Sequence, residues 1–343
     1  MKKIRLGKTD LMVSEVGFGG IPIIPLSKDE AMTVVRRCFE LGFNFFDTAN
    51  AYKDSEEKLG AALAPFRDEV VIATKTSERN ADAVAKHIDL SLQRLQTDRI
   101  DIFQLHDVSN EEALQQVLDP GGAYEALENA RAQGKIRFIG ISSHSIPVAM
   151  KALDTDLFQT LQFPFNFIEN DPTDQLFPQA RRMDVGLIGM KPLGGGVLER
   201  ADLCFGFLQQ YPYIVPIPGI QTTTEASEII DLYKNPVVLT ESQLKAMDKI
   251  KSILGEKFCH RCEYCMPCDQ GVQIPMVLIY EGFAKRFSPE VAASIAQEAM
   301  AGVENCIECG QCEEKCPYKL PILGLLKENL ALFKKCNSST GAN

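Results

Sequence analysis

The 343-residue sequence contains no tryptophan and only four histidines, and it has no excess of basic residues. Lysine and arginine number 36 against 46 aspartates and glutamates, which gives a formal net charge of −10 at pH 7. Because nucleic acids and anionic membrane surfaces attract basic patches, this balance disfavours both as binding partners. Apolar residues make up 45% of the chain and charged residues 24%, as in an average globular protein, so the composition argues against a disordered or fibrous chain.

Long apolar runs are also missing. No stretch reaches the roughly 18 apolar residues that a membrane-spanning helix needs. The N-terminal segment meets Gly7, Lys8 and Asp10 before the apolar core of a signal peptide can form. We therefore expect a cytoplasmic protein with no membrane partner. In such a reducing compartment, clustered cysteines are more often metal ligands than disulfide partners.

Short apolar runs alternate with amphipathic stretches from about residue 10 to residue 235, which is typical of parallel strands joined by crossover helices. The eight candidate strands are 13–19, 43–49, 70–75, 100–106, 137–142, 157–163, 185–190 and 213–219. The amphipathic stretches include 28–41, 80–96, 122–133 and 173–184. Eight such units in about 225 residues predict an α/β fold, a (β/α)8 TIM barrel. A doubly wound sheet is the rival, but the first strand is not followed by a GxGxxG turn that leads directly into a helix.

Eight of the eleven cysteines fall in two runs. The second run, CIECGQCEEKCP at 306–317, has the C-x2-C-x2-C-x3-C-P spacing with which bacterial ferredoxins bind [4Fe-4S] clusters. The first run, CHRCEYCMPC at 259–268, spaces four cysteines by two residues each. Zinc sites usually show two CxxC pairs separated by a loop, so two runs of four favour two [4Fe-4S] clusters over zinc. The expected ligands are Cys259, Cys262, Cys265, Cys268, Cys306, Cys309, Cys312 and Cys316.

In two-cluster ferredoxins the last cysteine of each run binds the other cluster. We therefore expect Cys316 to complete the cluster of the first run and Cys268 to complete that of the second. The helical stretch at 289–300 indicates a small, mainly helical ferredoxin-like domain. The clusters could support the fold of this tail, exchange electrons with a partner protein, or sense oxygen or redox state. The cysteines without an assigned role are Cys38, Cys204 and Cys336.

These patterns predict four segments along the chain. The barrel takes residues 1–240, and the iron–sulfur domain takes 258–336. A connecting helix at 241–257 lies between them, with Thr240 as its N-cap and Gly255 as its stop. Residues 337–343 are expected to form a disordered tail.

Catalytic groups in such barrels lie at the carboxyl ends of the strands. Three consecutive predicted strands end on ionisable residues, namely Asp47, Lys75 and His106. Each shares its side of the strand with the residues two and four positions before it, so the three side chains are expected to converge. Tyr52 follows Asp47 by five residues, within reach of a loop that folds back over the barrel mouth.

This set of residues suits carbonyl reduction. A carbonyl that accepts a hydride also needs a proton, and a phenol is too weak an acid at neutral pH unless a cation stabilises its phenolate. We expect Tyr52 to be the general acid and Lys75 the cation, with Asp47 holding the ammonium group. His106 would orient the substrate oxygen. Each residue alone has commoner structural roles, so the prediction rests on their joint occurrence.

The same motifs resemble the aldo-keto reductase family over about residues 3–235. The matching segments are LGKTDLMVSEVGFGG (6–20), FFDTANAY (45–52), VVIATK (70–75), SLQRLQTDRIDIFQLH (91–106), GKIRFIGIS (134–142), KPLGGG (191–196) and IPG (217–219). The resemblance implies an NAD(P)H-dependent reductase of a small-molecule aldehyde or ketone, with either NAD(H) or NADP(H) as cofactor. The residues at the family's catalytic positions are Asp47, Tyr52, Lys75 and His106. Histidine at position 106, where members that reduce steroid C=C bonds carry glutamate, favours C=O reduction.

The resemblance also implies a cofactor site. Ser142, Ser143 and Gln162 fall where the family holds the nicotinamide carboxamide. Met190 stands where the family commonly stacks a tyrosine on the nicotinamide, so that contact is lost or replaced by a thioether contact. Leu193 and Gly195, in the LGGG segment, lie either at the pyrophosphate or in a simple turn.

The segment after the last predicted strand bears on cofactor preference. Members that prefer NADPH place a lysine and an arginine there for the 2′-phosphate, whereas this chain has Gly219 and Glu225. A carboxylate repels that phosphate, which favours NADH. Lys191 or Arg200 remain alternative phosphate ligands.

Two other functions stay open. The chain could be an electron-transfer or redox-partner subunit whose barrel is only a nucleotide-binding scaffold, or a regulatory subunit that senses nucleotide. The intact set of four ionisable residues favours the reductase.

Without tryptophan, other side chains must line a substrate pocket. Four apolar residues would either line it or belong to the core, namely Ile21, Ile23, Phe163 and Phe165.

Overall fold

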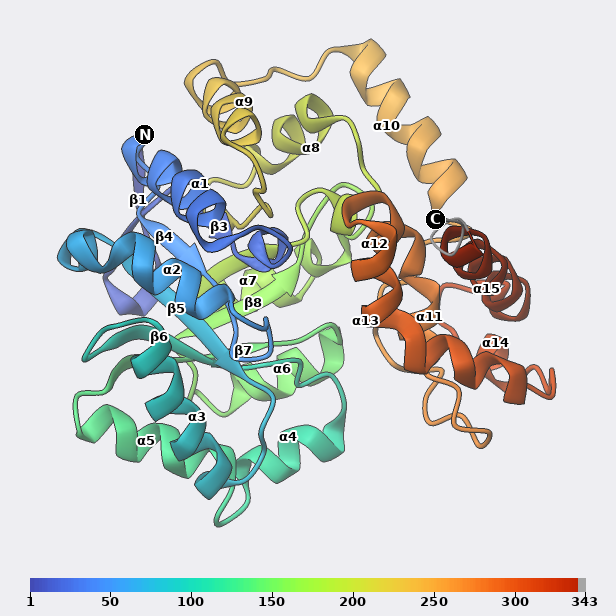
Figure 1. Cartoon of the computed structure of the whole chain (residues 1–343), viewed down its shortest axis with the longest axis horizontal. Helices are drawn as coiled ribbons and strands as arrows, with labels where there is room; N and C mark the ends of the chain where they lie inside the picture. Colours follow the sequence, from blue (N-terminus) through green and yellow to red (C-terminus); the bar gives the residue numbers. More distant parts are fainter. Residues whose placement is uncertain (339–343) are drawn as a thin grey trace. The chain divides into compact units, whose positions relative to one another are not determined.

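A computed structural model describes residues 1–338 of the chain (Figure 1). The chain divides into two compact units. The first contains Met1–Pro192 and Ala201–Val238, and the second contains Leu193–Arg200 together with the chain from Leu239 onward. The region predicted as the barrel therefore contributes one short segment, Leu193–Arg200, to the second unit.

The first unit is built on eight parallel strands. They are β3 (Phe18–Gly19), β4 (Phe45–Asp47), β5 (Val71–Thr76), β6 (Ile100–Leu105), β7 (Ile136–Ser142), β8 (Thr160–Pro164), β9 (Gly186–Met190) and β10 (Ile214–Pro216). Neighbours in the sequence are neighbours in the sheet. Gly17 N donates to Pro216 O at 2.9 Å and Gly19 N to Pro218 O at 2.8 Å, so the first strand region also joins the last. The predicted (β/α)8 barrel is confirmed.

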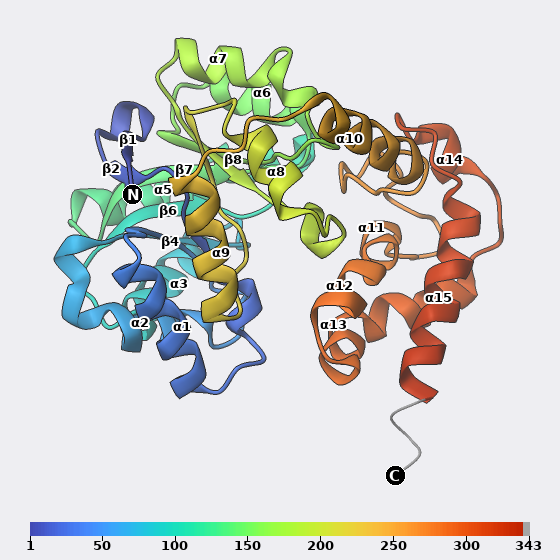
Figure 2. The ribbon, with the colours of Figure 1, turned by 90° about the horizontal axis from the view of Figure 1, so that it is seen from above.

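Helices lie on the outer side of these strands (Figure 2). They are α1 (Lys28–Glu40), α2 (Ser55–Leu63), α3 (Ala81–Arg94), α4 (Glu111–Leu118), α5 (Ala123–Ala132), α6 (Ile146–Asp154), α7 (Leu176–Arg182), α8 (Ala201–Leu208) and α9 (Thr223–Lys234). Local sequence sets several of their starts. Ser27 and Glu30 form a reciprocal capping box at α1, and the Asn80 side chain accepts a hydrogen bond from Ala83 N at α3.

The first predicted strand, 13–19, is wrong as a single element. Its start belongs to β2 (Met12–Ser14), which pairs antiparallel with β1 (Lys3–Arg5). Its end is β3. The chain turns between them because Ser14 Oγ donates to Val16 O at 2.8 Å and Asn44 Oδ1 accepts from Ser14 N.

An apolar core fills the barrel interior at the end where the strands begin. Its members from the N-terminal hairpin and the strands include Leu6, Leu11, Val13, Phe45, Val71, Ala73, Ile102, Ile188, Val215 and Ile217. Side chains two residues apart on a strand share a face. The inward positions after Phe45, Ala73 and Ile102 are therefore Asp47, Lys75 and Gln104, all buried. The interior thus changes from apolar to polar toward the carboxyl ends of the strands.

The second unit is helical over its described residues. Its helices are α10 (Glu241–Leu254), α11 (Ile274–Leu278), α12 (Tyr280–Arg286), α13 (Pro289–Gly302), α14 (Gln311–Lys315) and α15 (Ile322–Ser338). Thr240 caps α10 in a box with Gln243, and Gly255 follows its last residue. A core that includes Tyr280, Ala296 and Leu326 also buries Cys312 and Cys316.

The predicted disordered tail at 337–343 begins too early. Helix α15 continues through Ser338, two residues beyond the boundary that the sequence suggested. The rest of that tail, 339–343, lies outside the described residues.

Candidate active site and cysteine clusters

Asp47 at the end of β4 and Lys75 near the end of β5 form an ion pair inside the barrel. Lys75 Nζ donates to Asp47 Oδ1 and to Thr48 O, both at 2.6 Å. The two side chains are 4% and 0% exposed. Burial raises the pKa of Asp47, and hydrogen bonds from Lys75, Gln104 and Gln162 oppose this shift. Burial lowers the pKa of Lys75, opposed by the charges of Asp47 and Glu56.

Tyr52 and His106 complete the predicted group. Lys75 Nζ lies 5.4 Å from the centroid of the Tyr52 ring. The Tyr52 and His106 rings meet edge to face, with centroids 5.7 Å apart. Both side chains are half-buried, whereas the ion pair beneath them is sealed from solvent. The structure therefore brings all four predicted residues together.

Sequence reasoning gave no role to Gln104, although it lies at the centre of this site. Gln104 Nε2 donates to Asp47 Oδ2 at 3.2 Å and to Gln162 Oε1 at 2.9 Å. The signal that could have found it is a glutamine on the inward face of the apolar strand IDIFQLH, two residues before His106.

Ser142 and Ser143 follow β7 beside Gln162. The strand register pairs Ser142 with Gln162, and Ser143 N donates to Gln162 O at 3.1 Å. The Ser142 hydroxyl accepts from Asp107 N at 2.9 Å, and the Ser143 hydroxyl accepts from Ser145 N at 3.1 Å. The structure thus groups the three residues expected at the carboxamide, with both hydroxyls already bonded to the backbone.

A second polar pair that the sequence did not reveal lies next to His106. His144 Nδ1 and Asp107 Oδ1 are 2.9 Å apart, and the Ser109 hydroxyl also donates to Asp107 Oδ1. Arg79 Nη2 donates to the carbonyl oxygens of His106 and Asp107 at 2.8 and 3.0 Å. These bonds fix the backbone that carries His106.

The remaining cofactor residues of the first unit lie after the last two strands. Met190 ends β9 and packs in part against the barrel core. Lys191 follows it in a left-handed conformation, φ 55°. Gly219 bridges to Gly19 where the barrel closes. Glu225 forms a capping box at the start of α9, where its Oε2 accepts from Gln221 N at 2.6 Å and Thr222 N at 3.1 Å.

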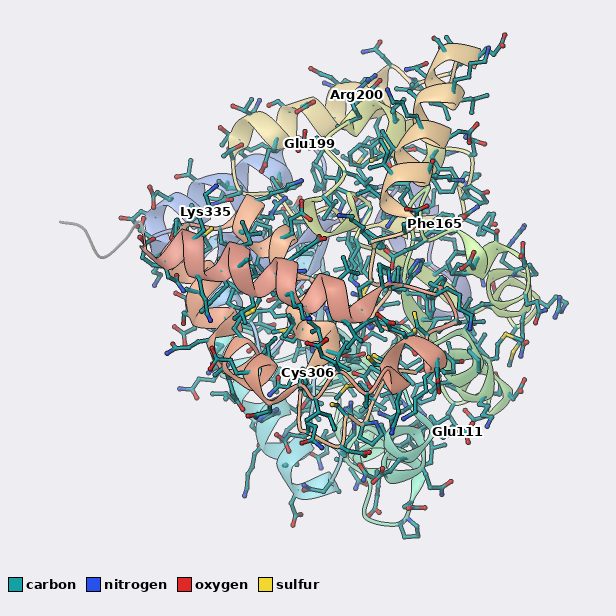
Figure 3. The ribbon with its side chains drawn as sticks, turned by 90° about the vertical axis from the view of Figure 1, so that its right-hand side faces the viewer. Glu111, Phe165, Glu199, Arg200, Cys306 and Lys335 are labelled. Atoms are coloured by element: carbon teal, nitrogen blue, oxygen red, sulfur yellow. The ribbon has the colours of Figure 1, made fainter. Side chains whose placement is uncertain are left out.

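Leu193 and Gly195 lie in the segment that groups with the second unit. Gly194, Gly195 and Gly196 all have positive φ, which glycine adopts without strain. Within the second unit this segment packs on α12, with the Lys285 ammonium 3.8 Å from the Glu199 carboxylate. Figure 3 labels Glu199 and Arg200. The glycine run therefore belongs to the second unit.

Two of the four apolar residues that could line a substrate pocket belong to the core instead. Phe165 is fully buried and stacks edge to face on Phe177 and Tyr211, with centroids 5.0 and 4.9 Å away. Ile23 is also fully buried.

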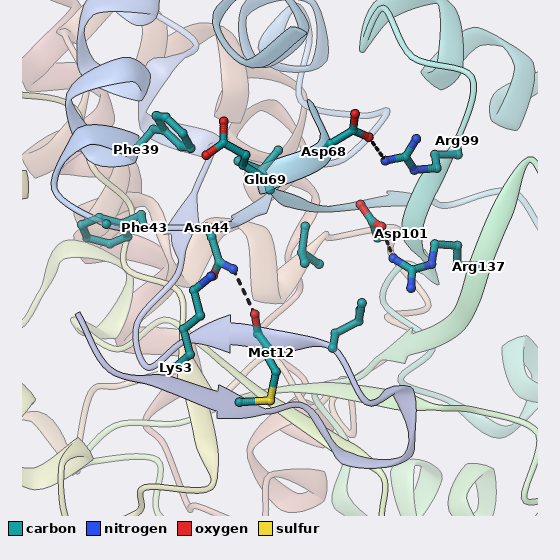
Figure 4. A pocket seen from close by; sticks show the side chains of 14 residues that line it. Lys3, Met12, Phe39, Phe43, Asn44, Asp68, Glu69, Arg99, Asp101 and Arg137 are labelled. Carbon is teal, nitrogen blue, oxygen red and sulfur yellow. Dashed lines mark hydrogen bonds and ion pairs between the residues drawn. The ribbon is translucent and has the colours of Figure 1, made fainter. Parts of the chain in front are cut away.

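A cavity of about 540 Å³ lies at the opposite end of the strands, beside the β1–β2 hairpin (Figure 4). Four of its six charged lining residues pair with one another. Arg137 donates to Asp101 at 2.8 Å, and Arg99 donates to Asp68 at 2.5 Å. This cavity lies where the strands begin and contains none of the predicted catalytic residues, so we assign it no role in the reaction.

The second cysteine run lines a small cavity in the second unit. Its volume is about 70 Å³, and its lining includes Cys268, Cys306, Cys309 and Cys312, together with Cys265. These first four are the cysteines expected to share one cluster. The donor set, cysteines of both runs around one small cavity, fits a [4Fe-4S] group.

Contacts also link the first run to Cys316. Burial raises the pKa of Cys262, and Cys316 lies close enough to add to that shift. His260, which follows Cys259, stacks on Tyr318 with ring centroids 3.6 Å apart. The end of the second run thus lies against the first run, as the crossed ligand pairing requires.

All eleven cysteines lie within the described residues, and none of them forms a disulfide there. Over the same part of the chain, no three His, Cys, Asp or Glu side chains approach closely enough to bind a single metal ion. The thiolates of a [4Fe-4S] cluster bind four different iron atoms and stand further apart than ligands of one ion. Among helices of residues 1–338, none is long and apolar enough to cross a membrane.

Solved structures share the barrel. An aldo-keto reductase from Bacillus halodurans in its holo form superposes with a TM-score of 0.64 at 23% identity, over 73% of this chain and 96% of that one. An aldo/keto reductase from Klebsiella pneumoniae in complex with NADP and acetate gives a TM-score of 0.62 at 22% identity, over 73% and 95%. At this identity the likeness establishes the fold.

Curated relatives match the same region. L-galactose dehydrogenase from Arabidopsis thaliana is 34% identical over 212 residues, covering 56% of this chain and 66% of the relative. An uncharacterized oxidoreductase from Bacillus subtilis is 29% identical over 217 residues, covering 59% and 68%. The chain thus spans about two thirds of the length of these relatives.

Family profiles cover both units. The 4Fe-4S dicluster domain profile matches residues 258–321, and the aldo/keto reductase family profile matches residues 15–205, more than half of the chain. The chain therefore belongs to the aldo/keto reductase family and carries a 4Fe-4S dicluster domain in its C-terminal part.

Proposed function

We propose that the protein reduces an aldehyde or ketone to an alcohol with NADH or NADPH, and that Tyr52 donates the proton. The observation that carries this proposal is the buried ion pair of Lys75 and Asp47 beneath the Tyr52 ring. The bound nicotinamide supplies the hydride. All other steps fall to side chains of this chain.

Tyr52 is suited to proton donation by its neighbours. Its ring lies within reach of the Lys75 ammonium, which favours the phenolate that remains after the proton has left. His106 meets the same ring from the side, so a carbonyl oxygen between the two would accept hydrogen bonds from both. Both side chains are half-buried, which leaves access for a small substrate.

The charged form of the Lys75–Asp47 pair is supported by its surroundings. Asp47 and Thr48 O accept from the ammonium, and Gln104 donates to the second carboxylate oxygen. These bonds replace the water that burial removes. Lys75 thus stays a cation in place, at a fixed distance from the phenol.

The nucleotide would lie along Gln162, Ser142 and Ser143 at the carboxyl ends of β7 and β8. The amide oxygen of Gln162 accepts from Gln104 Nε2 at 2.9 Å, and its NH2 group interacts with the Asp47 carboxylate. An NH2 group has two N–H bonds, so one of them would serve a carboxamide oxygen. Met190 offers a thioether rather than an aromatic face to the nicotinamide. Lys191 is the nearest cation in sequence to this group.

NADH is the preferred form in this proposal. The Glu225 carboxylate accepts from two backbone N–H groups at the start of α9, the kind of position that binds phosphate in other proteins. It therefore competes with a 2′-phosphate both by occupying the donors and by charge. Gly219 supplies no cation to offset this effect.

We propose two [4Fe-4S] clusters in the second unit. Cys259, Cys262, Cys265 and Cys316 would hold one, and the second would be held by Cys268, Cys306, Cys309 and Cys312. The clusters supply one-electron redox chemistry when bound. The stacking of His260 on Tyr318, which brings the end of the second run against the first, and the 70 Å³ cavity lined by the second set support this pairing.

Electron exchange with a partner protein is a second candidate function. Cys309 is exposed, and Ile307 beside it is 65% exposed. A cluster held by Cys309 would lie close to the surface, as a donor or acceptor of single electrons must. Anaerobic addition of NADH would test it: cluster bleaching supports electron exchange, and clusters that stay oxidised favour a structural role. The cytoplasm, which keeps thiols reduced, suits both candidates.

The test of the main proposal is Tyr52→Phe in the iron–sulfur-loaded protein. A panel of aldehydes and ketones is offered with NADH and NADPH. Turnover should fall by about 10²- to 10⁴-fold while the dissociation constant of the nucleotide stays unchanged, as loss of a general acid predicts. Unchanged turnover in Tyr52→Phe, or no reduction of any carbonyl by the wild-type protein, would contradict the proposal.

A further inference from the structure

Gln104 lies inside the barrel between the two parts of the proposed active site. Its side chain is fully buried, at 0% exposure. Its Nε2 donates to Asp47 Oδ2 at 3.2 Å and to Gln162 Oε1 at 2.9 Å. One amide nitrogen therefore joins the residue that holds Lys75 to the residue expected at the nicotinamide.

These two acceptors determine which way round both amides lie. If the Gln104 amide were turned over, its oxygen would face the Asp47 carboxylate and the Gln162 oxygen, and buried oxygens would repel one another. With Gln104 donating, Gln162 uses its oxygen as an acceptor, so its NH2 group is the donating end. This NH2 group interacts with the Asp47 carboxylate, and its second N–H would be directed to a ligand. A nicotinamide carboxamide oxygen is an acceptor that fits such a donor.

The strand register explains how Gln104 comes to this place. Gln104 is paired with Lys75 on β5 and with Gly140 on β7, and Gly140 is paired with Thr160 on β8. A Cβ at Gly140 would overlap Thr160 Oγ1 and lie 2.9 Å from Gln104 Cγ. The glycine therefore leaves the room that the Gln104 side chain needs.

Gln104 is held at its donor end alone. Its Oε1 is buried without a hydrogen-bond partner among the residues that the structure describes, and so is Thr160 Oγ1 across Gly140. A buried acceptor without a partner lowers stability, and an apolar side chain of the same length avoids that cost. The stability that Gln104 gives to the fold therefore comes only from its donor bonds to Asp47 and Gln162, two residues of the proposed site.

We infer that Gln104 is a positioning residue that couples the proton-donating group to the nucleotide site. It holds the Asp47 carboxylate in place for Lys75, and it turns the Gln162 amide so that one N–H serves the nicotinamide. The inference rests on the proposed function and deepens it. It makes nucleotide binding and proton donation depend on one buried amide.

The test uses Gln104→Met, which keeps the length of the side chain and removes the amide, in the intact iron–sulfur-loaded protein. Thr160→Val, which removes the neighbouring unpartnered hydroxyl, is the matched control. Gln104→Met should weaken binding of NADH by about 10-fold and lower kcat by about 10-fold, the size of one lost buried hydrogen bond in each case. Thr160→Val should keep wild-type kinetics, and its melting temperature should stay the same or rise. Gln104→Met should lose some stability, because it removes a donor from the buried Asp47 and Gln162 oxygens.

The pH profile supplies a readout that a structural role would not move. The Gln104 hydrogen bond lowers the pKa of Asp47, so its loss lets that pKa rise. Because Asp47 must be ionised to hold the Lys75 ammonium, the acid limb of the kcat/KM profile should move to higher pH in Gln104→Met. Gln104→Glu, which sets a second carboxylate against Asp47, should move it further in the same direction.

A double-mutant cycle identifies the route of the effect. If Gln104 acts on the nucleotide through Gln162, adding Gln104→Met to Gln162→Met should weaken NADH binding no further. Unchanged NADH affinity with an unmoved acid limb in Gln104→Met would overturn the inference, whatever the melting temperature of the variant. A wild-type protein that binds NADH but reduces no carbonyl would contradict the proposed function and leave the inference standing. The double-mutant cycle on NADH binding would then still test the role of Gln104. A wild-type protein that binds no nucleotide would defeat both.

Discussion

Lys75 Nζ lies 2.6 Å from Asp47 Oδ1 inside the barrel, and the side chains are 0% and 4% exposed. Two charges removed from water in this way stabilise a fold only while both are present. The pair joins β4 to β5 and stands beneath Tyr52. Stability and activity should therefore respond differently when one partner or both are replaced.

Lys75→Met should lower the free energy of unfolding by about 3–5 kcal/mol, because it leaves the Asp47 carboxylate buried without a cation. The double variant Asp47→Leu/Lys75→Met should recover most of that loss. Neither variant should reduce a carbonyl. Urea unfolding followed by circular dichroism measures the first two outcomes, and a double variant as unstable as Lys75→Met would count against the pair.

Cys38 and Cys204 should resist alkylation in the native protein. Burial raises the pKa of Cys204 to about 12 and raises that of Cys38 well above its ordinary value. Iodoacetamide at pH 9 should leave both unmodified until the barrel is unfolded, because the thiolate is the reactive form. Peptide mass mapping checks this, and rapid modification of either residue in the native protein would refute its burial.

The same two buried thiols should make the fold less stable at high pH. Unfolded cysteine ionises near pH 8.5, whereas the buried thiols stay neutral. Above that pH the native state binds more protons than the unfolded state, so the free energy of unfolding should fall as pH rises, by about 1.4 kcal/mol per pH unit for each thiol. The variant Cys38→Ala/Cys204→Ala should show a shallower fall between pH 9 and pH 11.

Glu225→Gln should shift cofactor preference toward NADPH. The amide oxygen keeps an acceptor for Gln221 N and Thr222 N, and the negative charge is lost. The ratio of NADPH to NADH affinity should rise by about 5- to 10-fold, as expected when one repulsive charge near a phosphate is removed. Glu228→Gln, an exposed glutamate on the same helix, is the control and should leave the ratio unchanged.

Cys316→Ser should cost about half of the bound iron, because Cys316 completes one of two proposed clusters. Cys336→Ser, in the same helical core region but outside the two runs, should keep its iron. Hydrogen exchange should speed up in α11–α15 of Cys316→Ser and stay unchanged in the barrel strands. Equal iron content in both variants would exclude Cys316 as a ligand.

Much of the barrel could be predicted from the sequence because eight short apolar runs alternate with amphipathic stretches. The site could be predicted because residues two apart on a strand share a face. That period put Asp47, Lys75 and His106 on the same side of three neighbouring strands. The first strand was predicted wrongly because the turn between β2 and β3 depends on Asn44, thirty residues away. The hydrophobic pattern carries no information about a hydrogen bond between residues so far apart in the sequence.

Two features of the site lay beyond sequence reasoning. Gln104 could be placed on the inward face of β6, but its bonds to Asp47 and Gln162 depend on the register of β4, β6 and β8 together. The segment Leu193–Arg200 follows the last residues of β9 in sequence, yet it packs with α12, some ninety residues later. Both depend on contacts between segments distant in the chain.

The most direct test of the account is transfer of a hydrogen label. The protein is given NADH that carries deuterium at the reactive C4 position of the nicotinamide, under anaerobic conditions, with a carbonyl substrate found in the panel. The account predicts one deuterium on the carbinol carbon of the product, a proton from solvent on its oxygen, and no bleaching of the clusters. A product without deuterium, formed while the clusters bleach, would show that electrons pass through the second unit and would contradict the proposed reaction at Tyr52.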